Sequence, residues 1–165
     1  LLTRVYTDVA APGRVALVKW ALAEGCPWKR GGGYNNMAYA VALHGHLELV
    51  RWLIQEQGFA MDGNMMRTAA RGGNLELVRW LRGEGCSWGV ETCHHAAYGG
   101  QLEVLQWLRA EGCPWDELTC HHAAVQGHVE VLRWARENGC PWDTGTRAQA
   151  AAELGYTDDL GNLVG

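Results

Sequence analysis

The sequence predicts an all-α fold, a helix-turn-helix solenoid of about six repeats. Gly112–Trp134 aligns without a gap with Gly85–Trp107, at an offset of 27 residues. A Gly followed seven residues later by a Trp recurs along the chain, and a second Gly closes each such segment. Self-similarity at a fixed period indicates a solenoid, in which each repeat packs only on its neighbours. The pairs are Gly13/Trp20, Gly45/Trp52, Gly73/Trp80, Gly100/Trp107 and Gly127/Trp134, and the closing glycines are Gly25, Gly58, Gly85, Gly112 and Gly139.

The segment between the two glycines of a repeat predicts the longer of two helices. In Leu102–Glu111 the apolar residues form a wide stripe at helical spacing. Glu103 lies in the first turn and Arg109 near the last, which is the arrangement that the helix dipole favours. Gly112 suits the left-handed end of a helix. Pro114, two residues later, prevents continuation.

A shorter helix is predicted before each turn. Thr92–Tyr98 and Thr119–Val125 are the clearest copies, and either Asp116 or Thr119 is a candidate cap for the second of them. Each of these helices carries a pair of alanines, whose small side chains allow two helices to approach closely. The pairs are Ala69-Ala70, Ala96-Ala97 and Ala123-Ala124.

The whole chain, 1–165, is interpreted as a single domain of such repeats. An insertion that contains three consecutive glycines separates the first two repeats and predicts a flexible bulge. The last repeat is degraded, because Asn162 stands where the other repeats carry Trp, and a polar terminal repeat suits a cap. The expected repeats are about 3–28, 37–61, 65–88, 92–115, 119–142 and the terminal 146–165, with the insertion at 29–36.

The segment Ala123–Leu132, with its Ala-Ala-x-x-Gly-His-x-Glu-Val pattern, resembles the centre of an ankyrin repeat. The resemblance covers nearly the whole chain, and the short period is similar to divergent arrays common in protists, algae and giant viruses. It implies that Cys120 takes the place of a buried Leu and that His121 takes the place of a His that hydrogen-bonds backbone in the neighbouring turn. Tetratricopeptide and HEAT solenoids are the alternatives, but they have longer periods and lack the Ala-Ala-x-x-Gly turn.

The period of 27 residues is shorter than the ankyrin period of about 33 residues. Because both helices are intact, the missing residues come from the connection that forms a β-hairpin finger in ankyrin repeats. We therefore expect an ankyrin-like solenoid whose fingers are shortened or absent. Trp88, Trp115 and Trp142 in these loops would cover the helix ends. The helix residues Trp52, Trp80, Trp107 and Trp134 predict core or inter-repeat packing.

Composition narrows the classes of function. A net charge of −4 with dispersed basic residues disfavours nucleic acid as a partner. No apolar run approaches the roughly 20 residues of a membrane helix, so we expect no membrane insertion. The six cysteines recur with the repeat, which indicates structural thiols and an intracellular, most simply cytoplasmic, location. The chain begins with Leu1 rather than Met, so the sequence is also compatible with a truncated N-terminus and organellar targeting.

Two Cys-His-His segments are the only candidates for chemistry. They are 93–95 and 120–122, and Cys and His are both metal ligands and nucleophile–base partners. Consecutive helix residues point about 100° apart, so the three side chains cannot converge on one ion. The same places hold Ala38-Tyr39-Ala40 and Met66-Arg67-Thr68 in earlier repeats. We expect no catalytic residues, no cofactor and no metal.

The favoured function is a non-catalytic protein–protein interaction module. The resemblance implies that the turns and the outer face of the shorter helices line a concave groove. Tyr and Arg are typical anchors of protein interfaces. The alternatives are a structural or scaffolding subunit of a larger complex, with its loop tryptophans buried against a neighbour, and a Cys/His metal-binding protein. The candidate partner-binding residues are Tyr39, Arg67, Arg71, His95, Tyr98 and His122.

Overall fold

A computed structural model describes residues 16, 18–20, 24, 37–147 and 150. Within these residues the regular structure is helical, and no strand occurs. Most of the predicted repeat 3–28, the insertion 29–36 and most of the terminal repeat 146–165 lie outside the described residues. The helices are α3 (Met37–Leu43), α4 (Leu47–Gln55), α5 (Gly63–Arg71), α6 (Leu75–Gly83), α7 (Val90–Tyr98), α8 (Leu102–Ala110), α9 (Glu117–Val125) and α10 (Val129–Glu137).

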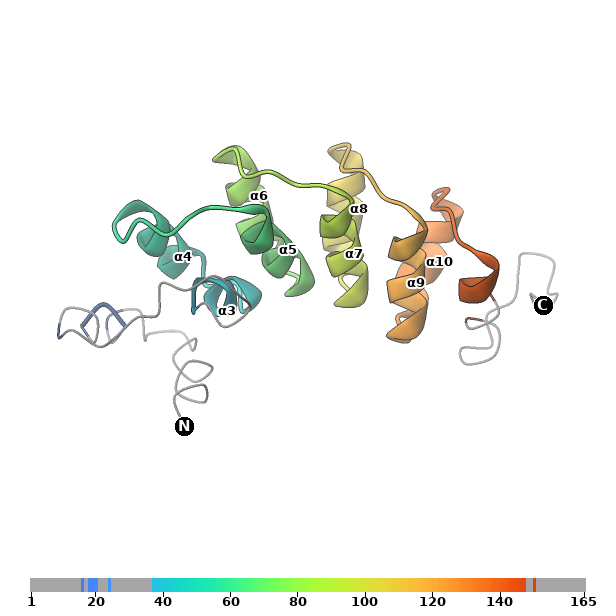
Figure 1. Ribbon diagram of the computed structural model, residues 1–165, viewed down its shortest axis with the longest axis horizontal. Helices are drawn as coiled ribbons and strands as arrows, with labels where there is room; N and C mark the ends of the chain where they lie inside the picture. The colour runs from blue at the N-terminus through green and yellow to red at the C-terminus, as the bar shows by residue number, and fades with distance from the viewer. Residues whose placement is uncertain (1–15, 17, 21–23, 25–36, 148–149, 151–165) are drawn as a thin grey trace.

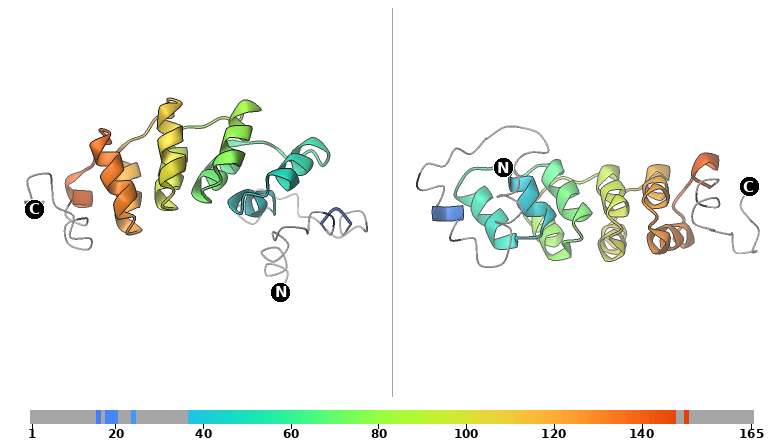
Figure 2. Two further views of the ribbon diagram at one scale, coloured as in Figure 1. Left: turned by 180° about the vertical axis from the view of Figure 1, so that it is seen from behind. Right: turned by 90° about the horizontal axis from the view of Figure 1, so that it is seen from below.

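The helices pair in chain order and the pairs stand side by side in a curved row (Figure 1). The first helix of each pair contacts the first helix of the next, so α3, α5, α7 and α9 form one layer. The second helices α4, α6, α8 and α10 form the other layer, as the view from below shows (Figure 2). The predicted all-α solenoid is confirmed, and the connections between pairs contain no β-hairpin finger among the described residues.

The predicted difference in helix length is wrong. From α5 to α10 both helices of each pair have nine residues. The predicted starts of the first helices at Thr92 and Thr119 are two residues late. The helix α7 begins directly after its cap Gly89, and α9 begins directly after its cap Asp116. Asp116 is the cap of α9, where its side chain accepts a hydrogen bond from the Leu118 N–H at 3.0 Å. Thr119 is instead buried inside the helix.

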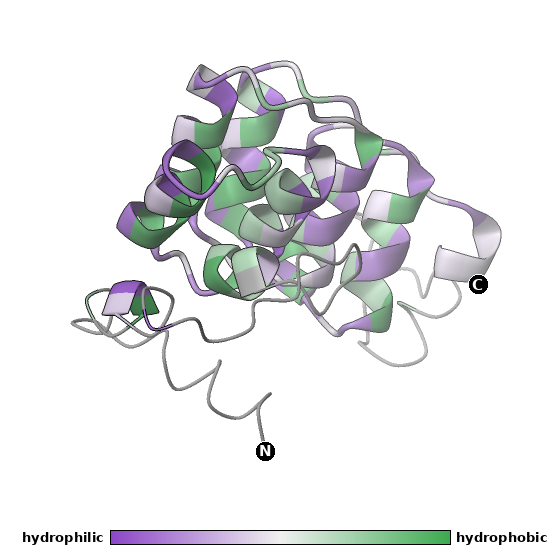
Figure 3. Ribbon diagram, turned by 60° about the vertical axis from the view of Figure 1, so that its left-hand side comes forward, coloured by the Kyte–Doolittle hydropathy of each residue, from purple (hydrophilic) through white to green (hydrophobic). Residues whose placement is uncertain are grey.

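The core lies between the two layers and between neighbouring pairs. The second helices contribute buried Leu and Val, and the first helices contribute the alanine pairs. Ala96 and Ala97 have no exposed surface, which confirms the expectation that these small residues sit where helices approach closely. Hydrophobic and hydrophilic residues alternate along each helix, as an amphipathic helix with one buried face requires (Figure 3).

The turn between α7 and α8 needs its two glycines for different reasons. Gly100 has a φ of 72°, in the left-handed region, and its N–H donates to the Ala97 carbonyl at 3.1 Å. Gly99 has an ordinary φ of −83°, but a Cβ added there would lie 2.1 Å from the Arg71 carbonyl oxygen of the preceding turn. The turns that follow α5 and α7 therefore touch backbone to backbone, and this contact requires glycine at position 99.

The connection between pairs ends each second helix in a compact, hydrogen-bonded form. Gly112 has a φ of 80°, as predicted for a left-handed helix end. Its N–H donates to the Arg109 carbonyl at 3.1 Å, and the Cys113 N–H donates to the Leu108 carbonyl at 2.8 Å. These are the two bonds of a Schellman motif, which satisfies the last carbonyls of the helix. The same pattern recurs at Gly85 and Gly139.

The loop tryptophans fill the space left by the absent finger. Trp115 is partly buried against the core and meets the Trp134 ring of the next pair edge-on, with centroids 5.8 Å apart. The Arg109 guanidinium lies over the other side of Trp115 at 4.3 Å and also donates to the Cys113 carbonyl. The arginine was missed by the sequence analysis. Its signal is an Arg six residues before each loop Trp, as in Arg82–Trp88, Arg109–Trp115 and Arg136–Trp142.

The tryptophans of the second helices pack between repeats, as predicted. Trp52 is buried, and Trp80, Trp107 and Trp134 are half-buried against the core. Cationic side chains from the preceding repeat lie over three of these rings, and Lys19 is 5.1 Å from the centroid of Trp52. Arg51 is 5.7 Å from the centroid of Trp80, and Arg79 is 5.7 Å from that of Trp107. Each contact joins two repeats on the second-helix side of the stack.

The stacking of turns predicts opposite effects for two alanine substitutions. Gly99→Ala should lower the free energy of unfolding by about 1–3 kcal/mol, because the new Cβ must displace the Arg71 carbonyl. Gly83→Ala is the matched control: a Cβ there meets nothing within 4 Å, and removing a helical glycine should stabilise by about 0.5–1 kcal/mol. Urea denaturation followed by circular dichroism measures both. Equal midpoints for the two variants would contradict the close contact of the turns.

Candidate functional site

The six predicted partner-binding residues all lie on the layer of first helices. Tyr39 is on α3, Arg67 and Arg71 are on α5, His95 and Tyr98 are on α7, and His122 is on α9. Because these helices contact one another in order, the side chains form a strip across four repeats. We call the set Tyr39, Arg67, Arg71, His95, Tyr98 and His122 the first-helix strip.

The centre of the strip is a chain of stacked side chains. The Arg71 guanidinium lies 4.6 Å from the centroid of the Tyr98 ring. The Tyr98 ring meets the His122 ring edge-on at 5.8 Å and 73°. One side chain from each of three consecutive first helices therefore contacts the next. The predicted mixture of basic and aromatic side chains is a continuous surface in the fold.

His95 lies next to the two arginines of the strip. Burial, followed by the positive charges of Arg67 and Arg71, lowers the pKa of His95 from 6.5 to about 4. Its Nδ1 atom is buried and has no hydrogen-bond partner among the described residues. His95 is therefore neutral near neutral pH, and the positive charge of this part of the strip comes from the arginines.

Tyr39 joins two repeats as well as lining the strip. Its hydroxyl donates to Asp62 Oδ2 at 2.7 Å, and Asp62 caps α5 by accepting from the Met65 N–H at 3.0 Å. Burial, with Asp62 next, raises the pKa of Tyr39. Arg67, which occupies the equivalent position in the next repeat, donates to the Asn64 side chain. The hydroxyl of Tyr39 is thus committed to the fold, while its ring remains half-buried.

The histidine position that the ankyrin resemblance singled out has a different partner from the one expected. His121 Nδ1 is 3.2 Å from the Thr146 hydroxyl, and the buried His94 donates through Nε2 to Asp116 Oδ1 at 2.6 Å. The expectation that His121 bonds backbone in the neighbouring turn is wrong for Nδ1, because the Thr146 hydroxyl of the next repeat faces this side of the helix. The backbone bond comes from His128, whose Nε2 donates to the Tyr98 carbonyl at 3.1 Å.

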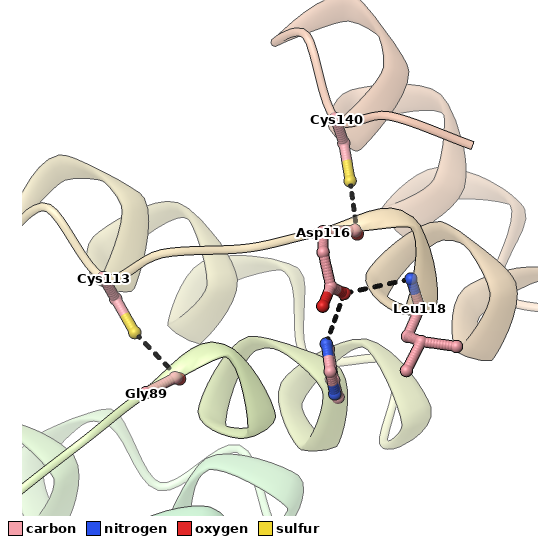
Figure 4. A network of polar contacts seen from close by, with 6 residues as sticks. Gly89, Cys113, Asp116, Leu118 and Cys140 are labelled. Atoms are coloured by element: carbon pink, nitrogen blue, oxygen red, sulfur yellow. Dashed lines mark hydrogen bonds and ion pairs between the residues drawn. The ribbon is translucent and has the colours of Figure 1, made fainter.

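The capping aspartates connect successive repeats. The same Oδ1 atom of Asp116 accepts from His94 on α7, the first helix of the preceding repeat, and from the Leu118 N–H of its own helix (Figure 4). Tyr39 and Asp62 form the corresponding pair two repeats earlier. The sequence signal is a donor 22 or 23 residues before a capping Asp. Gly89 holds the cap position of α7 and has no side chain to accept such a bond.

The cysteines are structural, as predicted. All five described cysteines are free and buried, including Cys120 in the place of the family's Leu. Cys113 Sγ lies 3.4 Å from the Gly89 carbonyl, and Cys140 Sγ lies 3.3 Å from the Asp116 carbonyl, so each loop is tied to the start of its own repeat (Figure 4). Burial raises the pKa of Cys86 to about 11, so this thiol does not ionise near neutral pH. Within the described residues no three His, Cys, Asp or Glu side chains are grouped so that they could hold a metal ion.

Two apolar side chains extend the strip and were missed by the sequence analysis. Leu118 and Val125 on α9 are 44% and 41% exposed. They stand four residues before and three after His122, so the three share one face of the helix. The signal was present as an apolar i, i+7 pair on the side of α9 opposite its buried alanines.

Comparisons with known proteins agree with this architecture. A family model described as ankyrin repeats in many copies matches residues 66–109. The crystal structure of the human ASB11 ankyrin repeat domain is similar, with a TM-score of 0.64 and 20% sequence identity over 88% of this chain and 76% of that chain. Among curated protein sequences, none matches significantly. In the described part of the chain, no helix is long and apolar enough to cross a membrane.

The double use of Asp116 makes its substitution costly. Asp116→Ala removes a helix cap, at about 1 kcal/mol, and leaves the buried His94 N–H without its acceptor, at about 1–3 kcal/mol. We expect the free energy of unfolding to fall by about 2–3 kcal/mol in urea denaturation. Asp116→Asn keeps an oxygen acceptor and should cost about 1 kcal/mol or less. Equal losses in the two variants would show that the acceptor bonds contribute little.

The lowered pKa of His95 predicts a pH dependence of stability. The unfolded chain binds a proton as the pH falls below 6.5, whereas the fold binds it only near pH 4. The contribution of neutral His95 is therefore complete above pH 6.5 and declines from there to about pH 4. His95→Gln removes this contribution to stability. As the pH is lowered from about 7.5 to about 5, the urea midpoint of the variant should therefore fall less than that of the parent chain. Parallel declines would contradict the shift.

Proposed function

Residues 66–109 of this chain are ankyrin repeats, and we propose that the array is a non-catalytic module that binds a protein partner through the helical concave face, formed by its first helices. Ankyrin repeats are generally protein–protein interaction modules. The proposal treats 1–165 as one array of about six repeats. The first-helix strip, together with Leu118 and Val125, is the surface assigned to the partner.

The observation that carries the proposal is a contrast between positions whose side chains recur in the repeats and positions whose side chains differ between repeats. Side chains that recur in the three repeats between 65 and 142 are used by the fold: the alanine pairs are buried, and the loop tryptophans lie under arginines. The strip positions differ between repeats. Arg71 is exposed, and no ion pair of the described residues includes it. Varied, partly exposed Arg and Tyr side chains on a rigid layer are typical of a protein-binding surface.

The contacts of the histidine and cysteine side chains support a binding function over catalysis. His94 is bonded to the capping Asp116 of the next repeat and His121 to the Thr146 hydroxyl, and the loop thiols of Cys86, Cys113 and Cys140 face backbone carbonyls. The free, buried cysteines also support a reducing compartment, for which we propose the cytoplasm. The alternative of a structural subunit rests on loop tryptophans exposed to a neighbour, and this support is weak because Trp88, Trp115 and Trp142 are partly buried within the chain.

Proximity labelling in the native source tests the proposal with two matched double variants. Arg71→Ala with Tyr98→Ala removes the centre of the strip, and Arg79→Ala with Gln106→Ala changes exposed residues of the second helices. We expect partner enrichment to fall at least tenfold for the strip variant and to change less than twofold for the control. Circular dichroism melts should show that both variants fold. Equal enrichment for the two variants would contradict binding through the first helices.

A further inference from the structure

The first-helix strip carries positive charge that the fold does not balance. Arg67 and Arg71 stand one helical turn apart on α5. No ion pair of the described residues includes either of them, since Arg67 donates to an amide oxygen and Arg71 lies on an aromatic ring. The charged groups that act on the neighbouring His95 are Arg67, Arg71, His122 and His94, all of them cationic or able to become so.

The acidic residues near the strip either accept hydrogen bonds within the fold or lie at the edge of the strip. Asp62 and Asp116 cap α5 and α9 and accept from Tyr39 and His94. Glu91 lies in the first turn of α7, where a negative charge is favoured by the helix dipole. No carboxylate of the described residues pairs with the Arg71 guanidinium, which is therefore open to an external anion.

The contact with Tyr98 orients Arg71 for such an anion. A guanidinium that lies over an aromatic ring keeps its N–H groups in the plane at its edge, where they can donate two parallel hydrogen bonds to one carboxylate. Because the ring restricts the side chain before binding, less conformational entropy is lost when the bonds form.

The other end of the strip is apolar. Leu118 and Val125 on α9 flank His122 and are the exposed large apolar side chains of residues 37–147. Between them and the arginines lie the aromatic rings of Tyr98 and His122, which contact each other. The surface thus changes from cationic on α5, through aromatic on α7, to apolar on α9.

We propose that this strip recognises an extended segment of a protein partner, in which an Asp or Glu that binds Arg71 is separated by about six residues from an aliphatic side chain that packs on Leu118 and Val125. The spacing follows from the geometry of the stack. Neighbouring packed helices are ~8–10 Å apart, so α5 and α9, two repeats apart, are separated by about 16–20 Å. An extended chain advances about 3.3 Å per residue, which makes five or six residues. This inference rests on the proposed binding function.

Peptide selection on the full chain tests the proposal. A library of random 12-residue peptides is displayed on phage and selected at near-physiological salt, and the affinities of selected synthetic peptides are measured by fluorescence polarisation. We expect enrichment of Asp or Glu at about five to seven residues from Leu, Ile or Val. Replacing the acidic residue of a selected peptide by its amide should weaken binding to the parent chain at least tenfold.

Two charge-reversal variants provide the matched comparison. Arg71→Glu and Arg79→Glu each reverse one exposed charge and remove one arginine–aromatic contact between repeats, to Tyr98 and to Trp107 respectively. Arg71→Glu should weaken the acidic peptides at least tenfold and should abolish the difference between acid and amide peptides. Arg79→Glu should change affinity less than twofold. Leu118→Ser with Val125→Ser should weaken binding of the selected acidic peptides, but the difference in affinity between acidic and amide peptides should remain.

The outcomes separate this inference from the proposed function. Selected peptides that lack acidic residues but lose affinity with Tyr98→Ala would overturn the acidic recognition and retain protein binding through the strip. Peptides that bind equally to every first-helix variant would overturn both. Tighter binding of a single-stranded oligonucleotide than of any selected peptide, with the same loss in Arg71→Glu, would overturn the inference in favour of nucleic acid.

Discussion

The close approach of neighbouring first helices is the contact on which the rest of the structure depends. Ala96 and Ala97 are fully buried, and the Cα of Gly99 comes so near the Arg71 carbonyl that a Cβ would lie 2.1 Å from it. A spacing this small brings side chains of successive repeats into contact across the layer. The stacking of Arg71 on Tyr98 and the bond from His94 to Asp116 both follow from it. The strip is continuous because the backbone beneath it is tightly packed.

The absence of hairpin fingers changes how the second-helix ends are protected. In the connections that follow α6, α8 and α10, a left-handed glycine completes the last turn and a thiol meets the cap carbonyl of the same repeat. An arginine and a tryptophan then cover the loop from outside. Backbone hydrogen bonds that a hairpin would supply between repeats are replaced by contacts of side chains. Under the proposed function, recognition would rely on the first helices and not on extended fingers.

The sequence predicted those features that depend on period and backbone conformation. The glycine positions, alanine pairs, buried thiols and missing fingers follow from recurrence at 27 residues and from what Gly, Ala and Cys can do in a helix or turn. Contacts between repeats were predicted less well. The partner of His94 was missed because a helical pattern gives the face on which a side chain lies but not which group of the next repeat stands opposite. The Arg109–Trp115 pair was missed because a helix residue and a loop residue do not share one helical face, although the spacing of six residues recurs in the sequence.

Adjacent positions of one helix divide the work between fold and recognition. His94 and His95 are neighbours in sequence, yet the first is bonded to the cap of the next repeat and the second faces the arginines of the preceding one. Tyr39 stands at the His94 position, which explains why its hydroxyl is bonded to Asp62 while Arg71, Tyr98 and His122 remain at the surface. A repeat can therefore change its recognition residues without altering its links to the next repeat. Under the proposed function, the binding preference of the array would follow from which repeats carry charge and which carry apolar side chains, in the order in which the stack presents them.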